Sequence, residues 1–194
     1  MGLSVMILGL VLFLGVHTLT TPREVRARVI ATAGESGYKI GYALVSFLGL
    51  ALIVWGFAHY RAAGMWEVWT PPTALKHLAV ALMLPAVILV VASYIRGRIY
   101  TTLKHPMLTG IKLWAAAHLL ANGDVGSIIL FGSFLCWAVF DRISLKHRTD
   151  SGAPPIPVGG RGNDAIAVAV GVVAYLALAF AFHPVVIGVP VVGV

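Results

Sequence analysis

Residues 104–124 read KHPMLTGIKLWAAAHLLANGD and place two histidines, two lysines and an aspartate within a mostly apolar chain. An ionisable group inside a bilayer costs about 3 kcal/mol, so its presence in a spanning segment suggests a functional site. The apolar run 106–121 ends at Asn122-Gly123-Asp124, a tight-turn sequence, and a second apolar run follows at 125–140. These two runs are expected to form a helical hairpin, with Asp124 as a turn residue or as the cap of the second helix.

The composition outside this segment is that of a membrane protein. Hydrophobic residues make up 59% of the 194 residues and charged residues only 11%, and the mean hydropathy is +0.93. A chain of this length can hold about six spans of roughly 20 residues. We therefore expect an all-α, polytopic membrane protein with about six hydrophobic helices in a single transmembrane domain over residues 1–194.

The predicted helices alternate with short polar segments that carry most of the charge. The net charge of +7 does not indicate nucleic-acid binding, because the lysines and arginines lie between apolar runs without interleaved aromatic residues. These basic residues gather on one side of the alternating spans, which predicts the cytoplasmic side. Beside the hairpin, we predict spans at 2–19, 38–57, 74–95 and 164–183, a polar connector with a short interfacial helix at 20–37, and a loop at 141–163.

Seven histidines are the main anomaly of residue type in this apolar chain. A neutral imidazole can be buried at modest cost and can ligate iron, copper or zinc, although a buried histidine with an ordinary hydrogen bond is an equally open interpretation. Four histidines lie at span ends or in loops, where solvated side chains are expected: His59, His77, His147 and His183. The remaining three are the candidate cofactor ligands: His17, His105 and His118.

The residue pattern narrows the class of metal site. A tetrahedral zinc site needs three or four His, Cys, Asp or Glu ligands, but the chain has no His-x-x-x-His pair, no clustered carboxylates and a single cysteine, Cys136. A haem needs only one or two axial imidazoles, and its large apolar ring suits a pocket between membrane helices. The residues therefore favour haem over isolated zinc.

Several motifs together resemble those of one family of bacterial membrane proteins. They are His17, the block 105–124, the runs 130–134 and 137–142, and the closing Ile187-Gly188-Val189-Pro190. With this combination the chain resembles the NnrU family over nearly its whole length. The resemblance implies a multi-pass protein of the bacterial inner membrane that is linked to denitrification, through the expression or maturation of nitrite and nitric oxide reductase. It also implies reductase components as partners, beside the lipid bilayer.

The NnrU family is in turn similar to zeta-carotene isomerase, which uses haem b with histidine ligation. Carried over residue by residue, the resemblance implies haem b with His17 and His118 as the metal ligands. A third histidine of that isomerase corresponds to Trp137 or a neighbour here, which counts against carotenoid isomerisation. Straight helices would place His17 and His118 at different depths in the bilayer, and His17 with His105 is then the alternative pair.

Two other function classes stay open at this point. One is a membrane methyltransferase, because a His-Pro dipeptide also opens a helical hairpin in isoprenylcysteine carboxyl methyltransferases. Those enzymes complete their cofactor site with a later glutamate, and this chain has no glutamate beyond Glu67. The other is a non-catalytic assembly factor for a reductase, so the sequence leaves open whether any reaction is catalysed.

Overall fold

The computed structural model describes residues 1–148 and 156–191, and within them it is helical without a β-strand element. The chain folds as two compact units. Unit 1 comprises Met1–Thr70 and Asn122–Ser144, and unit 2 comprises Pro71–Ala121 and Leu145–Val194. The all-α prediction is confirmed, while the prediction of a single domain over residues 1–194 stays a prediction.

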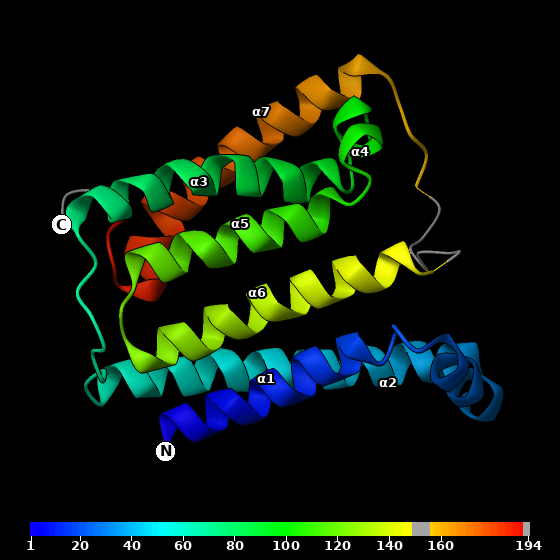
Figure 1. Ribbon diagram of the computed structural model, residues 1–194, viewed down its shortest axis with the longest axis horizontal. Coiled ribbons are helices and arrows are strands. Elements are labelled where there is room, and N and C mark those ends of the chain that lie inside the picture. The colour runs from blue at the N-terminus through cyan, green and yellow to red at the C-terminus, as the bar shows by residue number, and fades with distance from the viewer. Residues whose placement is uncertain (149–155, 192–194) are drawn as a thin grey trace. The chain divides into compact units, whose positions relative to one another are not determined.

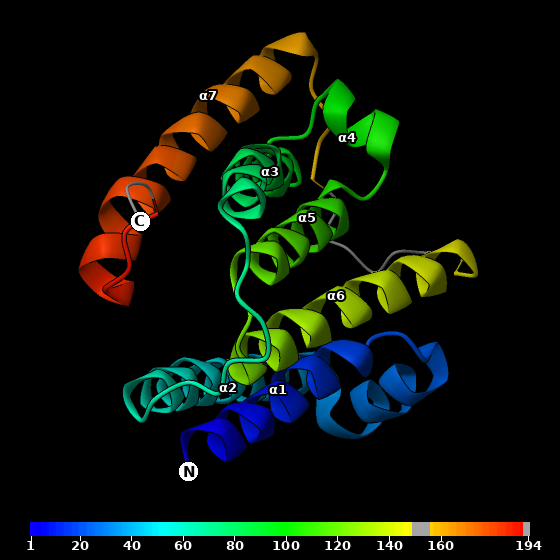
Figure 2. The same ribbon diagram turned by 60° about the vertical axis from the view of Figure 1, so that its left-hand side comes forward.

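Unit 1 contains α1 (Gly2–Thr18), α2 (Arg23–Ala62) and most of α6 (Val125–Lys146). Helices α1 and α2 run side by side (Figures 1 and 2), and four glycines let their backbones approach closely. A Cβ atom on Gly9 would lie 2.6 Å from the amide nitrogen of Ile53, and one on Gly56 would lie 2.8 Å from the carbonyl oxygen of Gly2. Such small residues are a common device at helix contacts in membranes, where van der Waals packing replaces the hydrophobic effect.

A break divides α2 into a polar and an apolar part. Gly34 has φ 74° and ψ 163° inside the helix, a conformation that only glycine adopts without strain. Residues 23–33 therefore form a separate short helix ahead of the long apolar one, as predicted for the connector at 20–37. The exposed side of the break carries the i,i+4 ion pair between Glu35 and Lys39, at 2.7 Å.

The segment that follows α2 forms hydrogen bonds with the turn predicted at Asn122-Gly123-Asp124. The carbonyl oxygen of Gly123 accepts hydrogen bonds from the amides of Val68 (2.8 Å) and Trp69 (3.2 Å). A Cβ atom on Gly123 would collide with the carbonyl oxygen of Trp69, so glycine is required there. The side chain of Asp124 caps α6 by accepting a hydrogen bond from the amide of Ser127, which settles its role as a helix cap.

Unit 2 contains α3 (Thr73–Ala92), α4 (Arg98–Leu103), α5 (Pro106–Ala121) and α7 (Arg161–Ala177), which continues as the π-helix η1 (Leu178–Ile187). Helix α3 lies between α5 and α7 (Figure 2). Glycines again make these contacts close, because Gly110 of α5 abuts the carbonyl of Ala86 and Gly171 of α7 abuts Ile88. Buried positions in the unit are mostly alanines, which permits this spacing.

Most predicted helices are confirmed, but several boundaries differ and one short helix was missed. The prediction for 106–121 coincides with α5, and those for 2–19 and 74–95 coincide closely with α1 and α3. The predicted loop at 141–163 is wrong at its start, because residues 141–146 continue α6, and wrong at its end, because α7 begins at Arg161. Residues 149–155 of that loop lie outside the described residues. Helix α4 was not predicted, since six residues carry too little periodicity to detect.

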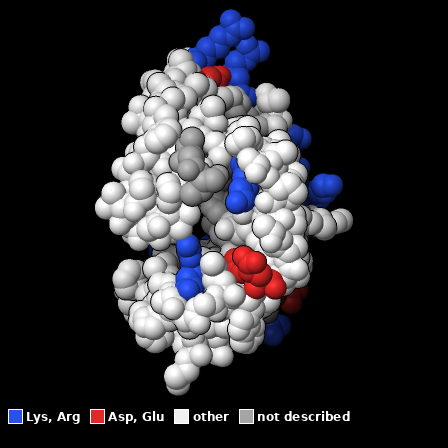
Figure 3. Space-filling model, turned by 90° about the vertical axis from the view of Figure 1, so that its left-hand side faces the viewer, with Lys and Arg blue, Asp and Glu red and all other residues white. Residues whose placement is uncertain are grey.

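The molecular surface fits a bilayer. Large apolar side chains stand exposed on the long helices, among them Phe47 at 74% and Val173 at 67%, and the face drawn in Figure 3 is mostly uncharged. Within the described residues, four helices are long and apolar enough to cross a membrane: α2, α3, α6 and α7 with η1. Helix α1 is apolar but shorter, with 17 residues. The chain is therefore a multi-pass membrane protein.

Candidate functional site

His118 lies near the end of α5 and is oriented by its own helix. Its Nδ1 atom is 2.9 Å from the carbonyl oxygen of Trp114, one turn earlier. A carbonyl oxygen can only accept, so Nδ1 carries the proton and the lone pair of the neutral ring lies on Nε2. The ring is partly buried, and Ala115 and Ala117 of the same helix are fully buried. This tautomer is the one that presents Nε2 to a metal, with the carbonyl fixing the ring from behind.

His183 lies in the π-helix η1 and faces His118 within unit 2. The two ring centroids are 6.3 Å apart and the ring planes differ by 28°. The Nδ1 atom of His183 donates to the carbonyl oxygen of Leu178 at 2.9 Å, so its lone pair also lies on Nε2. His183 was expected to be a solvated histidine at a span end, but it is partly buried and paired with His118.

The end of η1 is held by the closing motif of the chain. Gly188 adopts the left-handed conformation with φ 74°, as is common directly after a helix. The amide of Val189 then donates to the carbonyl oxygen of His183 at 3.1 Å. The Ile187-Gly188-Val189-Pro190 motif thus fixes the backbone that carries His183. In the sequence this motif follows the His183-Pro184 dipeptide closely. That proximity is the signal from which a structured environment for His183 could have been predicted.

His17 lies in unit 1, near the end of α1, among aromatic side chains. Its ring stacks on Phe13 with centroids 4.2 Å apart and meets the edge of Trp137 at 5.8 Å. Tyr42 of α2 lies 5.2 Å away. The Nδ1 atom of His17 donates to the carbonyl of Phe13, so this ring has the same tautomer as His118. The buried Nε1 atom of Trp137 has no hydrogen-bond partner among the described residues.

His105 links α4 to α5 in unit 2. Its carbonyl oxygen accepts a hydrogen bond from the amide of Thr109 at 3.3 Å, which opens α5. The preceding Lys104 has φ 61°, a left-handed conformation that turns the chain sharply between the helices. The main chain of His105 therefore has a defined structural role at the start of the helix that carries His118.

The structure groups the candidate histidines by unit. His105, His118 and His183 belong to unit 2, whereas His17 belongs to unit 1. Ligation by His17 with His118, or by His17 with His105, stays a prediction. Over residues 1–148 and 156–191, no cluster of three or more His, Cys, Asp or Glu side chains is placed to hold a metal ion. Among the candidate histidines, His118 and His183 are in contact with each other through their rings.

Comparison with known proteins places this chain in a family. A family model described as NnrU protein matches residues 5–191, which include all four candidate histidines and the closing motif. The chain belongs to the NnrU family. This confirms the resemblance drawn from the motifs, and the family is linked to denitrification. Searches of curated proteins and of solved structures gave no match.

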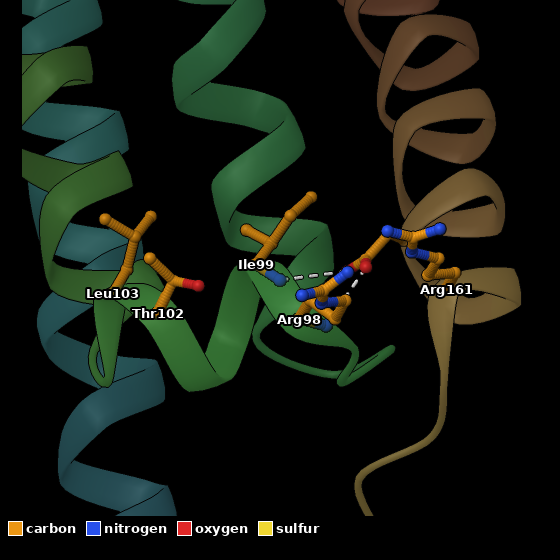
Figure 4. Close-up of a pocket in the computed structure, with 6 residues that line it drawn as sticks. Arg98, Ile99, Thr102, Leu103 and Arg161 are labelled. Atoms are coloured by element: carbon orange, nitrogen blue, oxygen red, sulfur yellow. Dashed lines mark hydrogen bonds between the residues drawn. The ribbon is translucent and has the colours of Figure 1, made fainter.

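Unit 2 of this NnrU-family protein also has an open cavity of about 500 Å³ between α4 and the start of α7. The carboxylate of Asp164 accepts hydrogen bonds from the amides of Arg98 (3.0 Å) and Ile99 (2.9 Å), drawn as dashed lines in Figure 4. Asp164 therefore fastens the short helix α4 to α7. The cavity is lined by Arg98, Ile99, Thr102, Leu103, Arg161 and Asp164.

Proposed function

We propose that this protein binds haem b within the membrane, with His118 as an axial ligand, and that it supports the expression or maturation of nitrite and nitric oxide reductase. The observation that carries the proposal is the state of His118. It lies on an apolar helix, and its Nδ1–H donates to the main-chain carbonyl of Trp114. Metal-bound histidines characteristically donate their second ring N–H to a carbonyl or carboxylate in this way.

The donor chemistry of the chain fits haem better than a bare metal ion. Zinc would require three or four clustered ligands, whereas haem iron takes four of its bonds from the porphyrin and needs only one or two from the protein. The histidines of this chain are isolated or paired, in helices rich in alanine, glycine and leucine. When bound, haem b would supply one-electron redox chemistry.

The residues around His118 have definable tasks in this proposal. The carbonyl of Trp114 fixes the orientation of the ring. Membership of a denitrification-linked family supports a role in nitrogen-oxide metabolism. The bacterial inner membrane is the proposed location, and the charge distribution favours the basic loops on its cytoplasmic side. Reductase components are the proposed partners.

Optical spectroscopy of the purified protein tests the proposal. We expect a Soret band in detergent, and after reduction the sharp α and β bands of low-spin haem b. Apoprotein should take up added haemin with the same result. A colourless preparation that also fails to take up haemin would overturn the haem assignment. Loss of nitrite and nitric oxide reductase activity in a deletion strain, restored by the wild-type gene but not by His118→Ala, tests the link to function.

A further inference from the structure

We propose that the cavity between α4 and α7 binds the phosphate headgroup of an anionic phospholipid. The cavity belongs to unit 2, its lining does not include His118, and its occupancy does not depend on haem binding. Its walls combine Arg98 and Arg161 with a hydroxyl group and apolar side chains of α4. Guanidinium groups are well suited to a phosphate, because their fixed N–H donors can bond two of its oxygens at once.

The fold engages one arginine at this end of unit 2 and leaves two others available. The side chain of Arg96 donates hydrogen bonds to the carbonyl oxygens of Ser93 and Ile156, both at 3.2 Å. Arg98 and Arg161 are exposed instead, and neither guanidinium forms a hydrogen bond or an ion pair within residues 1–148 and 156–191. Both side chains are therefore free to contact a ligand in the cavity that they line.

The charge of the lining favours an anion. Asp164 is the one carboxylate of the lining, and it accepts hydrogen bonds from the amides of Arg98 (3.0 Å) and Ile99 (2.9 Å). Two arginines against this single carboxylate give the lining a net charge of +1 (2 − 1). Figure 4 shows Arg98 and Arg161 toward the α7 side of the cavity. A positive lining in a concave site attracts negatively charged ligands.

The two walls of the cavity are held together by hydrogen bonds. The carbonyl oxygen of Arg96 accepts bonds from the amide of Gly159 (2.8 Å) and from the side-chain amide of Asn163 (2.9 Å). With the bonds of Asp164, they hold the start of α7 against the segment that leads into α4. The site is therefore formed before a ligand binds, which reduces the cost of ordering it.

The cavity lies where lipid headgroups are expected. Helix α3 ends at Ala92, shortly before α4, and α7 begins at Arg161. Both helices are long and apolar enough to span a membrane, so the cavity lies at their polar ends. Basic pockets between membrane helices on the cytoplasmic side bind anionic headgroups. The charge distribution predicts that this end of unit 2 is cytoplasmic.

The remaining lining residues distinguish a phospholipid from a free phosphate ion. Leu103, which is 40% exposed, and Ile99 give the cavity an apolar wall. The hydroxyl group of Thr102 can donate a hydrogen bond to a phosphate or glycerol oxygen. Figure 4 shows Thr102 and Leu103 next to each other on α4. A ligand with both a phosphate and hydrocarbon chains uses all of these features, whereas a free phosphate ion uses only the polar ones.

Isothermal titration calorimetry of the full-length protein in neutral detergent tests the inference, with mixed micelles of dioleoylphosphatidylglycerol as the titrant. We expect Arg98→Gln/Arg161→Gln to weaken binding roughly thirtyfold, because two basic contacts with one headgroup are lost. Arg28→Gln/Lys39→Gln is the matched control, since it removes two positive charges from exposed ion pairs of unit 1. This control should change the affinity by less than about threefold. Equal affinities for the two double variants would overturn the inference.

Two further titrants identify the source of the phosphate. Dioleoylphosphatidylcholine has the same chains and a neutral headgroup, so we expect binding at least about fivefold weaker. Equal binding of the two lipids would overturn the assignment to an anionic headgroup. Inorganic phosphate should show no saturable binding, and saturable binding that is lost in Arg98→Gln/Arg161→Gln would assign the site to a free phosphate compound instead. Should this double variant not fold, unchanged lipid affinity in Arg161→Gln alone would overturn the inference.

Discussion

The carboxylate of Asp124 accepts a hydrogen bond from the main-chain amide of Ser127 at 2.9 Å, with both residues buried. This contact caps α6 directly after the turn that joins it to α5. The segment after α2 bonds to the same turn, where the Val125 amide donates to the carbonyl of Trp66 at 2.9 Å. The short sequence 122–125 thus begins α6 and also holds the segment that follows α2 through hydrogen bonds.

Removal of this cap should destabilise unit 1. Replacing an N-cap aspartate by alanine costs about 1–2 kcal/mol, because a main-chain amide loses its acceptor. We expect Asp124→Ala to lower the free energy of unfolding by that amount, measured by SDS titration in mixed micelles. Asp124→Asn keeps an acceptor oxygen and should lose less than half as much. Equal losses in the two variants would show that the charge, and not the cap, stabilises this turn.

The α1–α2 contact should not tolerate a larger residue at Gly9. A Cβ atom there would lie 2.6 Å from the amide nitrogen of Ile53 and 2.7 Å from the carbonyl oxygen of Gly49, both rigid backbone atoms. We expect Gly9→Val to destabilise the protein by about 1–3 kcal/mol through overpacking. Gly15→Val is the control on the same helix, since nothing described lies within 4 Å of its Cβ position. Similar unfolding free energies for both variants would contradict this packing.

Asp164 should control the stability of α4. Its two carboxylate oxygens bond the amides of Arg98 and Ile99, and a hydrogen bond to a charged group contributes about 1.5–3 kcal/mol. We predict that Asp164→Ala speeds hydrogen exchange of the 98–103 amides by roughly tenfold or more, as measured by mass spectrometry. Glu24→Ala, which removes only an exposed ion pair with Arg28, should leave that exchange unchanged. Slow exchange in Asp164→Ala would refute this anchoring role.

The indole N–H of Trp137 offers a test of the His17 cluster. This buried donor has no acceptor among the described residues, and an unsatisfied buried donor costs about 1–3 kcal/mol. Trp137→Phe removes the donor along with some apolar area, so we expect unfolding free energies within about 1 kcal/mol of the unsubstituted protein. Trp137→Ala, by contrast, should lose about 3–5 kcal/mol. A loss above about 2 kcal/mol in Trp137→Phe would mean that the N–H has a partner in the native protein.

The competing methyltransferase hypothesis makes an opposite prediction about cofactors. It requires S-adenosylmethionine to bind near His105 and Pro106, but the chain carries no glutamate after Glu67 to complete such a site. We expect isothermal titration calorimetry with the purified protein to show no saturable binding. Haemin titrated into the same preparation serves as the positive control. Saturable micromolar binding of S-adenosylmethionine would reverse the order of the two functions.

The sequence by itself determined most of the helices and the family of this protein. Apolar runs of suitable length must become helices in lipid, because every main-chain polar group has to be bonded within its own segment. For this reason α1, α3 and α5 were predicted closely, and the Asn122-Gly123-Asp124 turn between α5 and α6 was recognised from local chemistry. The motifs around His17, His118 and residues 187–190 were sufficient to indicate the NnrU family, which the match over residues 5–191 confirms.

Only the tertiary structure decided which residues meet. His183 faces His118 although 65 residues separate them (183 − 118), and Asp164 reaches Arg98 across 66 positions. No local pattern encodes such pairs, because they depend on how α3, α5 and α7 pack through their small residues. The π-helix likewise follows no apolar periodicity, and within it the Nδ1 atom of His183 lies 2.9 Å from the carbonyl oxygen of Leu178. Helix formation is a local property of the chain, whereas the contact between the His118 and His183 rings depends on packing between helices that are distant in sequence.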